Sequence, residues 1–294
     1  MSTSYSLDDL KRYHDEAMQF FNAELLLLQE IMPRIRDNRI GKASMLLVSC
    51  SQTGAALLQL AKKIDFFRNE SVMLSRAFIE RITNFCYVGI CDEKEFRAFT
   101  LHPIYKHYHN VMLPKMEDHF EFTTAEEYAE AATKKSEERK QKQEQLKKIP
   151  DIQEALTIFS DTNPNLNWTK KKLNEKIEVI AKSGKLIDVF FTINKIQYYS
   201  DASETLHGSL YGCTYNAGVF NPDFDFAKEG ELDKKIYKDN TCVLLHMGML
   251  LHESFTLISY TSDIKQIWDY SYKNRNQALN LLYHVLERKN HLMK

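Results

Sequence analysis

The sequence is poor in glycine and proline, the residues that tight turns need most. Only 9 Gly and 6 Pro occur among 294 residues, which leaves little material for the many turns of an all-β fold. A long uninterrupted apolar run is also missing, because the longest one, residues 242–260, carries His246, His252 and Glu253. That segment is too polar for a membrane span and is typical of a buried core helix. Since helix-favouring residues are plentiful, we expect an all-α protein.

An excess of charge of one sign is absent as well. The formal net charge is -1, so no global field draws the protein to nucleic acid or to an anionic membrane, although a local basic patch can still do so. The five cysteines are scattered and lack Cys-x2-Cys spacing, and the N-terminus does not resemble a signal peptide. We therefore expect a cytoplasmic protein with reduced, mostly buried thiols and no membrane association.

The motifs that usually mark cofactor or metal chemistry are not found. There is no Gly-rich phosphate loop, no Gly-x-Ser-x-Gly elbow and no His-Glu-x2-His pattern. His102, His107 and His109 cluster in the sequence, but their spacing does not place them on one helix face, so a zinc site there is not expected. The sequence thus predicts neither a cofactor nor a resident metal ion.

Helical periodicity predicts a multi-helix bundle within one domain, residues 1–294. Ser6, followed by Asp8 and Asp9, is a helix start, and this first helix runs to about residue 34. Together with helices over 42–67 and 71–90 it forms the first half of the bundle. Further helices are expected over 93–114, 152–159, 168–184, 186–207, 233–262 and 274–290. The helix over 168–184 is expected to open at Trp168 and Thr169.

Residues 123–149 have a different composition. They contain almost no apolar residue after Ala132, and their acidic and basic residues are mixed at i, i+4 spacings. This pattern predicts an exposed, charged helical arm that is inserted within the domain and protrudes from it. Two interpretations stay open: an arm for a protein partner, a dimer mate or RNA, or a solvated spacer.

The most informative motif is formed by Tyr199, Ser203 and His207, which are four residues apart, with Gly208 directly after them. On a helix this spacing places a phenol, a hydroxyl and an imidazole in one column. The imidazole can act as a general acid or base near neutral pH, and the hydroxyls can position a phosphate. The alternative is a histidine at a helix end that binds a neighbouring carbonyl or carboxylate, and the sequence does not decide between the two.

A second polar column lies in the helix expected over 71–90, where Arg76, Glu80 and Asn84 are again four residues apart. Arg76 and Glu80 can pair, and a buried guanidinium needs such a partner. In the functional interpretation this column faces the Tyr-Ser-His column, so that Arg76 holds an anion while His207 moves a proton. In the structural interpretation it is an internal ion pair that fixes the register of the helices.

The segment SRAFIERITNFCYV, which contains Arg76 and Glu80, resembles the Arg-x3-Glu helix of a bacterial helical family, domain-of-unknown-function family 5677. That family also has a downstream tryptophan, a helix soon after it and a Tyr-x3-Ser-x3-His motif. In this chain they correspond to Trp168, the segment TKKKLNEKIEVIAKSG and the Tyr-Ser-His column. The resemblance covers roughly residues 43–262 and implies a helical fold without a settled activity.

The helical build and the late histidine of that family are in turn similar to the HEPN group of prokaryotic ribonucleases and toxins. Those enzymes use an Arg-x4-6-His motif, usually across a dimer, to cut RNA without a metal ion. This chain departs from the pattern, since no arginine lies four to six residues before His207. If the chemistry is HEPN-like, the arginine must come from another helix, and Arg76 is the candidate.

Two functional hypotheses follow. The first is a metal-independent ribonuclease, a toxin-like effector in antiphage defence, in which His207 is the acid or base and Arg76 stabilises the phosphorane. Its other residues would position the phosphate (Tyr199, Ser203), orient Arg76 (Glu80, Asn84) or bind RNA (Lys170, Lys171, Lys172). The second is a non-catalytic binding or assembly protein of a defence or regulatory complex, in which the columns hold the bundle in register or bind a nucleotide. Both leave room for a homodimer or a protein partner on the charged arm.

Overall fold

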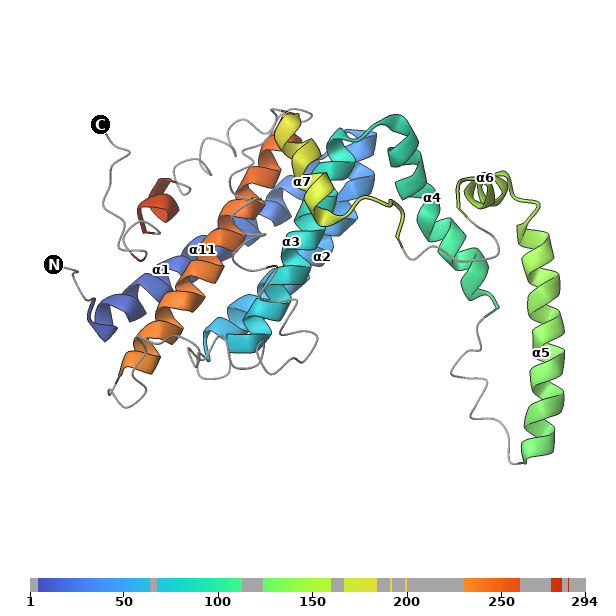
Figure 1. Cartoon of the computed structure of the whole chain (residues 1–294), viewed down its shortest axis with the longest axis horizontal. Helices are drawn as coiled ribbons and strands as arrows, with labels where there is room; N and C mark the ends of the chain where they lie inside the picture. The colour runs from blue at the N-terminus through green and yellow to red at the C-terminus, as the bar shows by residue number, and fades with distance from the viewer. Residues whose placement is uncertain are drawn as a thin grey trace. The chain divides into compact units, whose positions relative to one another are not determined.

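The computed structural model describes residues 5–63, 68–112, 124–159, 167–183, 191, 199, 230–259, 276–281 and 285 (Figure 1). Every regular element in these ranges is a helix, so the expectation of an all-α, multi-helix protein is confirmed. The chain divides into two compact units, one formed by residues 1–90 with 172–294 and the other by residues 91–171. This division describes contacts within the chain, whereas a domain is a part of the chain that folds on its own. The expected single domain over 1–294 therefore stays a prediction.

The first unit is built on a bundle of four long helices within the described ranges (Figure 1). Each of them packs on two neighbours, in the cyclic order α1, α2, α3, α11, so that α11 closes the ring against α1. A shorter helix, α7, packs on α3. The bounds are α1 (Leu7–Ile31), α2 (Asn38–Ala61), α3 (Arg68–Ile90), α7 (Leu173–Lys182) and α11 (Glu231–Ser259), with the 3-10 turn η1 (Met32–Arg34) between α1 and α2.

The start of α1 agrees with its sequence signal. The amide of Asp9 donates to the Ser6 hydroxyl at 3.1 Å, and the Asp9 carboxylate accepts from the amide of Ser6 at 3.3 Å. This reciprocal capping box satisfies amides that have no partner within the helix. A helix over 7–31 with a 3-10 turn to residue 34 therefore confirms the expected first element.

The starts of α2 and α7 differ most from the expectation. The Asp37 carboxylate accepts from the amide of Ile40 at 2.7 Å, so α2 is capped there and begins four residues before the expected residue 42. The expected opening of a helix at Trp168 and Thr169 is wrong. Thr169 accepts from the amide of Lys171 in a turn instead, and α7 begins only at Leu173.

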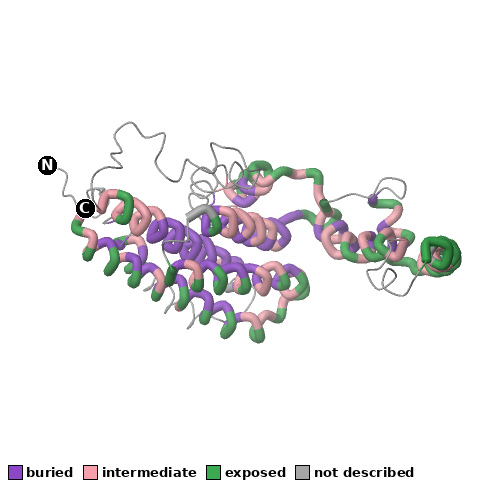
Figure 2. Tube along the Cα trace, turned by 90° about the horizontal axis from the view of Figure 1, so that it is seen from below, coloured by how far each residue is buried: buried purple, intermediate pink, exposed green. Residues whose placement is uncertain are grey.

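The core of the bundle is aromatic and aliphatic, and buried residues gather where its helices face one another (Figure 2). The rings of Phe21 on α1 and Phe78 on α3 meet edge to face, with centroids 5.6 Å apart. A Cβ atom added at Gly248 of α11 would lie 2.5 Å from the Phe20 ring of α1. The missing side chain at Gly248 thus allows α11 to approach α1 closely.

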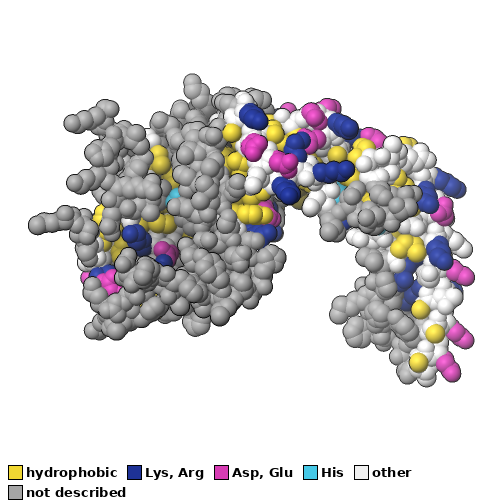
Figure 3. Space-filling model, in the orientation of Figure 1, with side chains coloured by type: hydrophobic (Ala, Val, Ile, Leu, Met, Phe, Trp, Pro, Cys, Tyr) yellow, Lys and Arg dark blue, Asp and Glu magenta, His cyan; other side chains and the backbone are white. Residues whose placement is uncertain are grey.

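The second unit contains α4 (Glu93–Asn110), α5 (Ala125–Leu146) and α6 (Pro150–Ile158). A small core between α4 and α6 includes Leu101, Tyr105 and Phe159. Helix α5 lies within the segment expected to be a charged helix, and Figure 3 shows basic and acidic side chains interspersed over it. The side-chain amide of Gln143 on α5 donates to the carbonyl oxygen of Tyr108 at 3.4 Å. The use of α5 as an arm for a partner stays a prediction.

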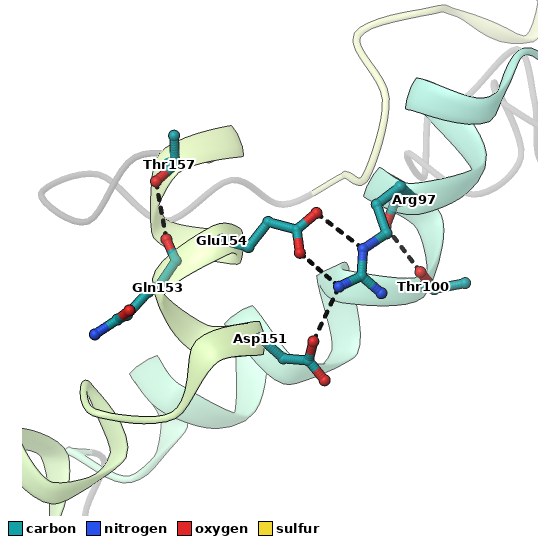
Figure 4. Close-up of polar contacts among 6 residues, drawn as sticks. All are labelled: Arg97, Thr100, Asp151, Gln153, Glu154 and Thr157. Carbon is teal, nitrogen blue, oxygen red and sulfur yellow. Dashed lines mark hydrogen bonds and ion pairs between the residues drawn. The ribbon is translucent and has the colours of Figure 1, made fainter.

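Ion pairs connect α4 to α6 in the second unit (Figure 4). Arg97 Nε and Nη2 donate to the two carboxylate oxygens of Glu154 at 2.9 and 2.5 Å, and Nη2 also donates to Asp151 at 2.9 Å. Such a two-pronged contact fixes both direction and distance. The hydrogen bond from Arg97 lowers the pKa of Glu154, so the charged form of this carboxylate is favoured in the folded protein.

This pKa shift makes the contribution of Glu154 to stability depend on pH. Because the pKa is lower in the folded than in the unfolded chain, the stabilisation is present above the unfolded value and is lost as the pH falls through the folded value. We expect Glu154→Gln to lower the melting temperature near pH 7 and to have a smaller effect near pH 3. Thermal unfolding at both pH values measures this. Glu144→Gln is the control, because the Glu144 carboxylate pairs with Lys147 at the C-terminal end of α5. Identical effects of the two substitutions would contradict the argument.

Candidate functional site

The polar column of α3 meets Tyr199, a residue of the later Tyr-Ser-His motif. Arg76 Nε lies 3.4 Å from Glu80 Oε1, one turn further along α3, and Arg76 Nη2 donates to the Tyr199 hydroxyl at 3.4 Å. The hydroxyl donates in turn to the same Glu80 oxygen at 2.8 Å. Three side chains, one of them 119 positions beyond Glu80 in the chain, thus form a closed triangle of hydrogen bonds. We call them the Arg76 cluster.

One edge of the Arg76 guanidinium contacts Glu80 and Tyr199, whereas the nitrogen at the other edge, Nη1, is buried. Its central carbon lies 4.7 Å from the centre of the Tyr199 ring, within the range of a cation–π contact. The Arg76 side chain is 19% exposed, against 41% for Glu80. Arg76 Nη1 is buried and has no hydrogen-bond partner among the described residues. Because a buried charged donor without an acceptor is costly, this edge of the guanidinium favours an anionic oxygen.

Tyr199 connects the two charged partners without adding charge. Burial, and after it the hydrogen bond to Glu80 and the negative charge of that carboxylate, raises the pKa of Tyr199 above its ordinary value. The phenol is therefore protonated at neutral pH and donates to Glu80. The cluster orients Arg76 through Glu80 and Tyr199, which is the arrangement required of a residue that binds an anion in a fixed direction.

Asn84, the third member of the α3 column, has a different partner. Its Oδ1 accepts from Lys176 Nζ of α7 at 2.6 Å, whereas the ribonuclease hypothesis gave Asn84 the role of orienting Arg76. The two ends of the column, Arg76 and Asn84, are separated by eight residues, about 12 Å along the helix axis. A positively charged side chain therefore lies at each end of the α3 column, Arg76 at one and Lys176 at the other. The sequence analysis missed the pairing of Asn84 with Lys176.

Other predicted site residues have no described contact with the Arg76 cluster. Ser203 and His207 lie outside the described residues, so their proximity to Arg76 stays a prediction. In the basic cluster, Lys171 Nζ binds Glu95 Oε1 at 2.6 Å, while Lys170 and Lys172 are exposed. The proposed contact of these lysines with RNA is likewise still a prediction.

The sequence analysis also missed a polar pair, Glu24 and His252, in the bundle core. Glu24 of α1 and His252 of α11 are both fully buried, and His252 Nδ1 lies 3.5 Å from Glu24 Oε2. A signal was present, because Glu24 falls in the same apolar stripe of its helix as Phe20, Phe21 and Leu28. A carboxylate in such a stripe needs a polar partner on a facing helix. Since neither side chain reaches solvent, the pair belongs to the packing of the bundle.

Two histidines of α4, His102 and His109, pack on aromatic rings. His109 packs on the rings of Tyr105 and Tyr108, with centroids 4.6 and 5.1 Å apart. In the described part of the chain, no three His, Cys, Asp or Glu side chains gather closely enough to hold a metal ion. The sequence expectation of no metal site at His102, His107 and His109 stays a prediction.

The cysteines within the described ranges, Cys50, Cys86, Cys91 and Cys242, are buried thiols. Burial raises the pKa of Cys242 to about 12, and burial also raises that of Cys86. A thiol of this kind is a poor nucleophile at neutral pH. The described cysteines therefore act as small core residues, as expected, while Cys213 lies outside the described residues.

Two described helices, Asn38–Ala61 and Glu231–Ile258, are long and apolar enough to cross a membrane by length and composition alone. The core helix of a soluble protein passes the same test. The apolar window of the second helix is 94% buried within the protein, that of the first only 44%. The second helix is thus explained by the bundle core, whereas the first leaves an apolar side uncovered.

A family model matches residues 43–224, and its description is a family of unknown function, DUF5677. The matched range covers more than half of the chain and includes both polar columns, α3 and Tyr199 among them. No curated protein and no solved structure matches the chain. Any statement on activity must therefore come from the site itself.

Proposed function

Because the chain belongs to DUF5677, a family of unknown function, we propose its activity from the site itself: a ribonuclease that cleaves RNA without a metal ion. The observation that supports this proposal best is the state of Arg76. Its guanidinium is oriented by Glu80 and Tyr199, and its Nη1 is buried without a partner among the described residues. A phosphate oxygen would supply the acceptor that this donor lacks.

The proposed chemistry uses two residues in defined roles. His207 removes the proton of a ribose 2′-hydroxyl, whose oxygen attacks the adjacent phosphorus while the bond to the 5′-oxygen breaks. The 5′-oxygen takes a proton from water, and His207 then releases its own proton to solvent. Negative charge grows on the non-bridging oxygens, and Arg76 Nη1 donates to one of them. The products are a 2′,3′-cyclic phosphate and a 5′-hydroxyl, so the step needs no further reactant.

Supporting residues act before the chemical step. Ser203 positions the phosphate in this proposal. Tyr199, whose proton is donated to Glu80, and Glu80 itself, 3.4 Å from Arg76 Nε, hold Arg76 in direction and so help to position the phosphate through it. Lys176, which binds Asn84 at the other end of the α3 column, adds a second positive charge near the path of the RNA backbone. Lys170, Lys171 and Lys172 are further proposed contacts to RNA. As a cellular role we propose a HEPN-like toxin or antiphage effector.

A non-catalytic role is the second candidate, and the closed triangle of Arg76, Glu80 and Tyr199 favours it. An arginine whose bonds are largely satisfied within the protein is also typical of a residue that fixes packing. In this role the cluster binds a nucleotide or holds a complex together, and His207 is not required.

Cleavage of RNA by the purified protein in the presence of EDTA tests the proposal. We expect wild type to cut, His207→Ala to cut about 10²–10⁴-fold more slowly, and His107→Ala, an exposed histidine of α4, to cut like wild type. Wild-type rates in His207→Ala would refute the mechanism. No cleavage by wild type would overturn the ribonuclease in favour of the binding role.

A further inference from the structure

A groove with a volume of about 630 Å³ runs along the bundle between α1 and α2. Its floor is apolar and includes Leu25 and Leu58. Charged lining residues, Asp15 and Lys62, lie only at the end where His14 binds the carbonyl of Ala61. Five further lining residues are amides: Gln19, Asn22, Gln29, Gln52 and Gln59. The groove is thus an apolar channel with neutral, hydrogen-bonding walls.

The outward side of α2 is unusual for a helix in contact with water. Residues 43–61 contain no charged side chain, yet only 44% of the apolar window of α2 is buried. Surface helices of soluble proteins carry charged residues on the side opposite the core. An uncharged side of this length is typical of a surface that another protein covers.

The same face carries apolar side chains that protrude. Leu26, which lines the groove on α1, is 51% exposed, and Met45 on α2 is 68% exposed. Met45, Gln52 and Gln59 are seven residues apart, so Met45 continues the stripe of α2 that forms the groove wall. The groove and the exposed side chains of Leu26 and Met45 therefore lie on the same surface of the bundle.

We propose that this α1–α2 face binds a second copy of the same chain and forms a twofold homodimer. An isologous interface requires a surface complementary to itself, and here the protruding Leu26 of each copy can enter the groove of the other. Amide side chains both donate and accept hydrogen bonds, so they can pair with the same residues of a second copy. The uncharged walls bring no like charges together, and the net charge of -1 leaves little repulsion between copies.

The dimensions of the face suit such an interface. From Asp15 to Gln29 the groove spans fifteen residues of α1, about 21 Å along the helix axis, which accommodates roughly four turns of a partner helix. Its 13 lining residues form the centre of an interface whose standard size is about 20–30 residues a side. None of them belongs to the Arg76 cluster, so the inference does not depend on the proposed ribonuclease. The surface also differs from α5, on which the sequence placed a dimer or partner contact.

The mass of the full-length protein in solution, measured by light scattering after size exclusion, tests the inference. We expect twice the chain mass of 34.5 kDa for wild type. Leu26→Glu and Ala55→Glu each place a charge in the groove, and each is expected to give monomer, with dimer affinity reduced at least about 100-fold. Both positions are exposed, so the monomeric variants are expected to remain folded, with a wild-type helical circular-dichroism spectrum.

The matched control is Leu232→Glu on α11, where a leucine of 39% exposure lies outside the groove. This variant is expected to remain dimeric. A dimer that survives both groove substitutions, or is lost equally with Leu232→Glu, would overturn the inference. A monomeric wild type at the highest soluble concentration would also overturn it and would leave the face to a different protein.

Discussion

Replacing Arg76 by alanine is expected to lower the rate of RNA cleavage by about 10²–10³-fold while the protein stays folded. The rate falls because the buried Nη1 no longer donates to the charge that develops on the phosphate. Stability changes little, because Arg76 and Glu80 are 19% and 41% exposed and Glu80 keeps the Tyr199 hydroxyl as a donor. The loss in free energy of unfolding should therefore be about 1 kcal/mol or less, the range of partly exposed pairs.

Two further variants separate an effect on cleavage from an effect on stability. Arg76→Lys keeps the charge but loses the planar fork, so an intermediate cleavage rate is expected. Arg81→Ala removes another arginine of α3, one that binds the carbonyl of Ser49 and the hydroxyl of Thr53, and it should affect stability more than cleavage. Cleavage rates and urea unfolding curves separate the two effects. If Arg76→Ala instead lowered stability by roughly 3–5 kcal/mol, as a broken buried pair does, the structural interpretation of the column would be correct.

Replacing Glu24 by alanine should have the largest effect on stability, a loss of roughly 3–5 kcal/mol. Glu24 and His252 are both fully buried, 3.5 Å apart, between α1 and α11. Removal of the carboxylate leaves His252 without this partner in the core and opens a cavity at the same time. Chemical denaturation with urea, monitored by circular dichroism, measures the difference.

Glu30→Ala, an exposed glutamate on the same helix, is the control and should change stability by less than about 0.5 kcal/mol. The double variant Glu24→Leu with His252→Phe removes both polar groups and should recover most of the loss, because a buried pair replaced by apolar residues is often neutral. An effect of Glu24→Ala no larger than that of Glu30→Ala would show that the pair contributes nothing to the bundle.

Local patterns explain the part of the site that could be predicted from the sequence. Residues four apart share a helix face, so Arg76 and Glu80 were recognisable as a pair, and a partly buried guanidinium needs further partners. Tyr199 meets that need from a segment far along the chain. The capping box at Ser6 and Asp9 is equally local, and it was found for the same reason.

Features set by packing between distant helices were not predictable in this way. Asn84 is bound by Lys176 because α7 packs on α3, and no spacing in the sequence encodes that choice. The pairing of Glu24 with His252 depends on which helix faces α1. The groove is of the same kind, since α2 contributes one wall and α1 the other. Composition could show only that residues 43–61 lack charge.

The cyclic order of the bundle also has a consequence for synthesis on the ribosome. Helices α1, α2 and α3 are complete at Ile90, but α11, which closes the ring against α1 and α3, begins only at Glu231. Translation at about 5–20 residues per second therefore leaves the apolar sides of the first three helices uncovered for roughly 7–28 s. During that interval the nascent chain is a substrate for chaperones, because the described bundle cannot close before α11 is made.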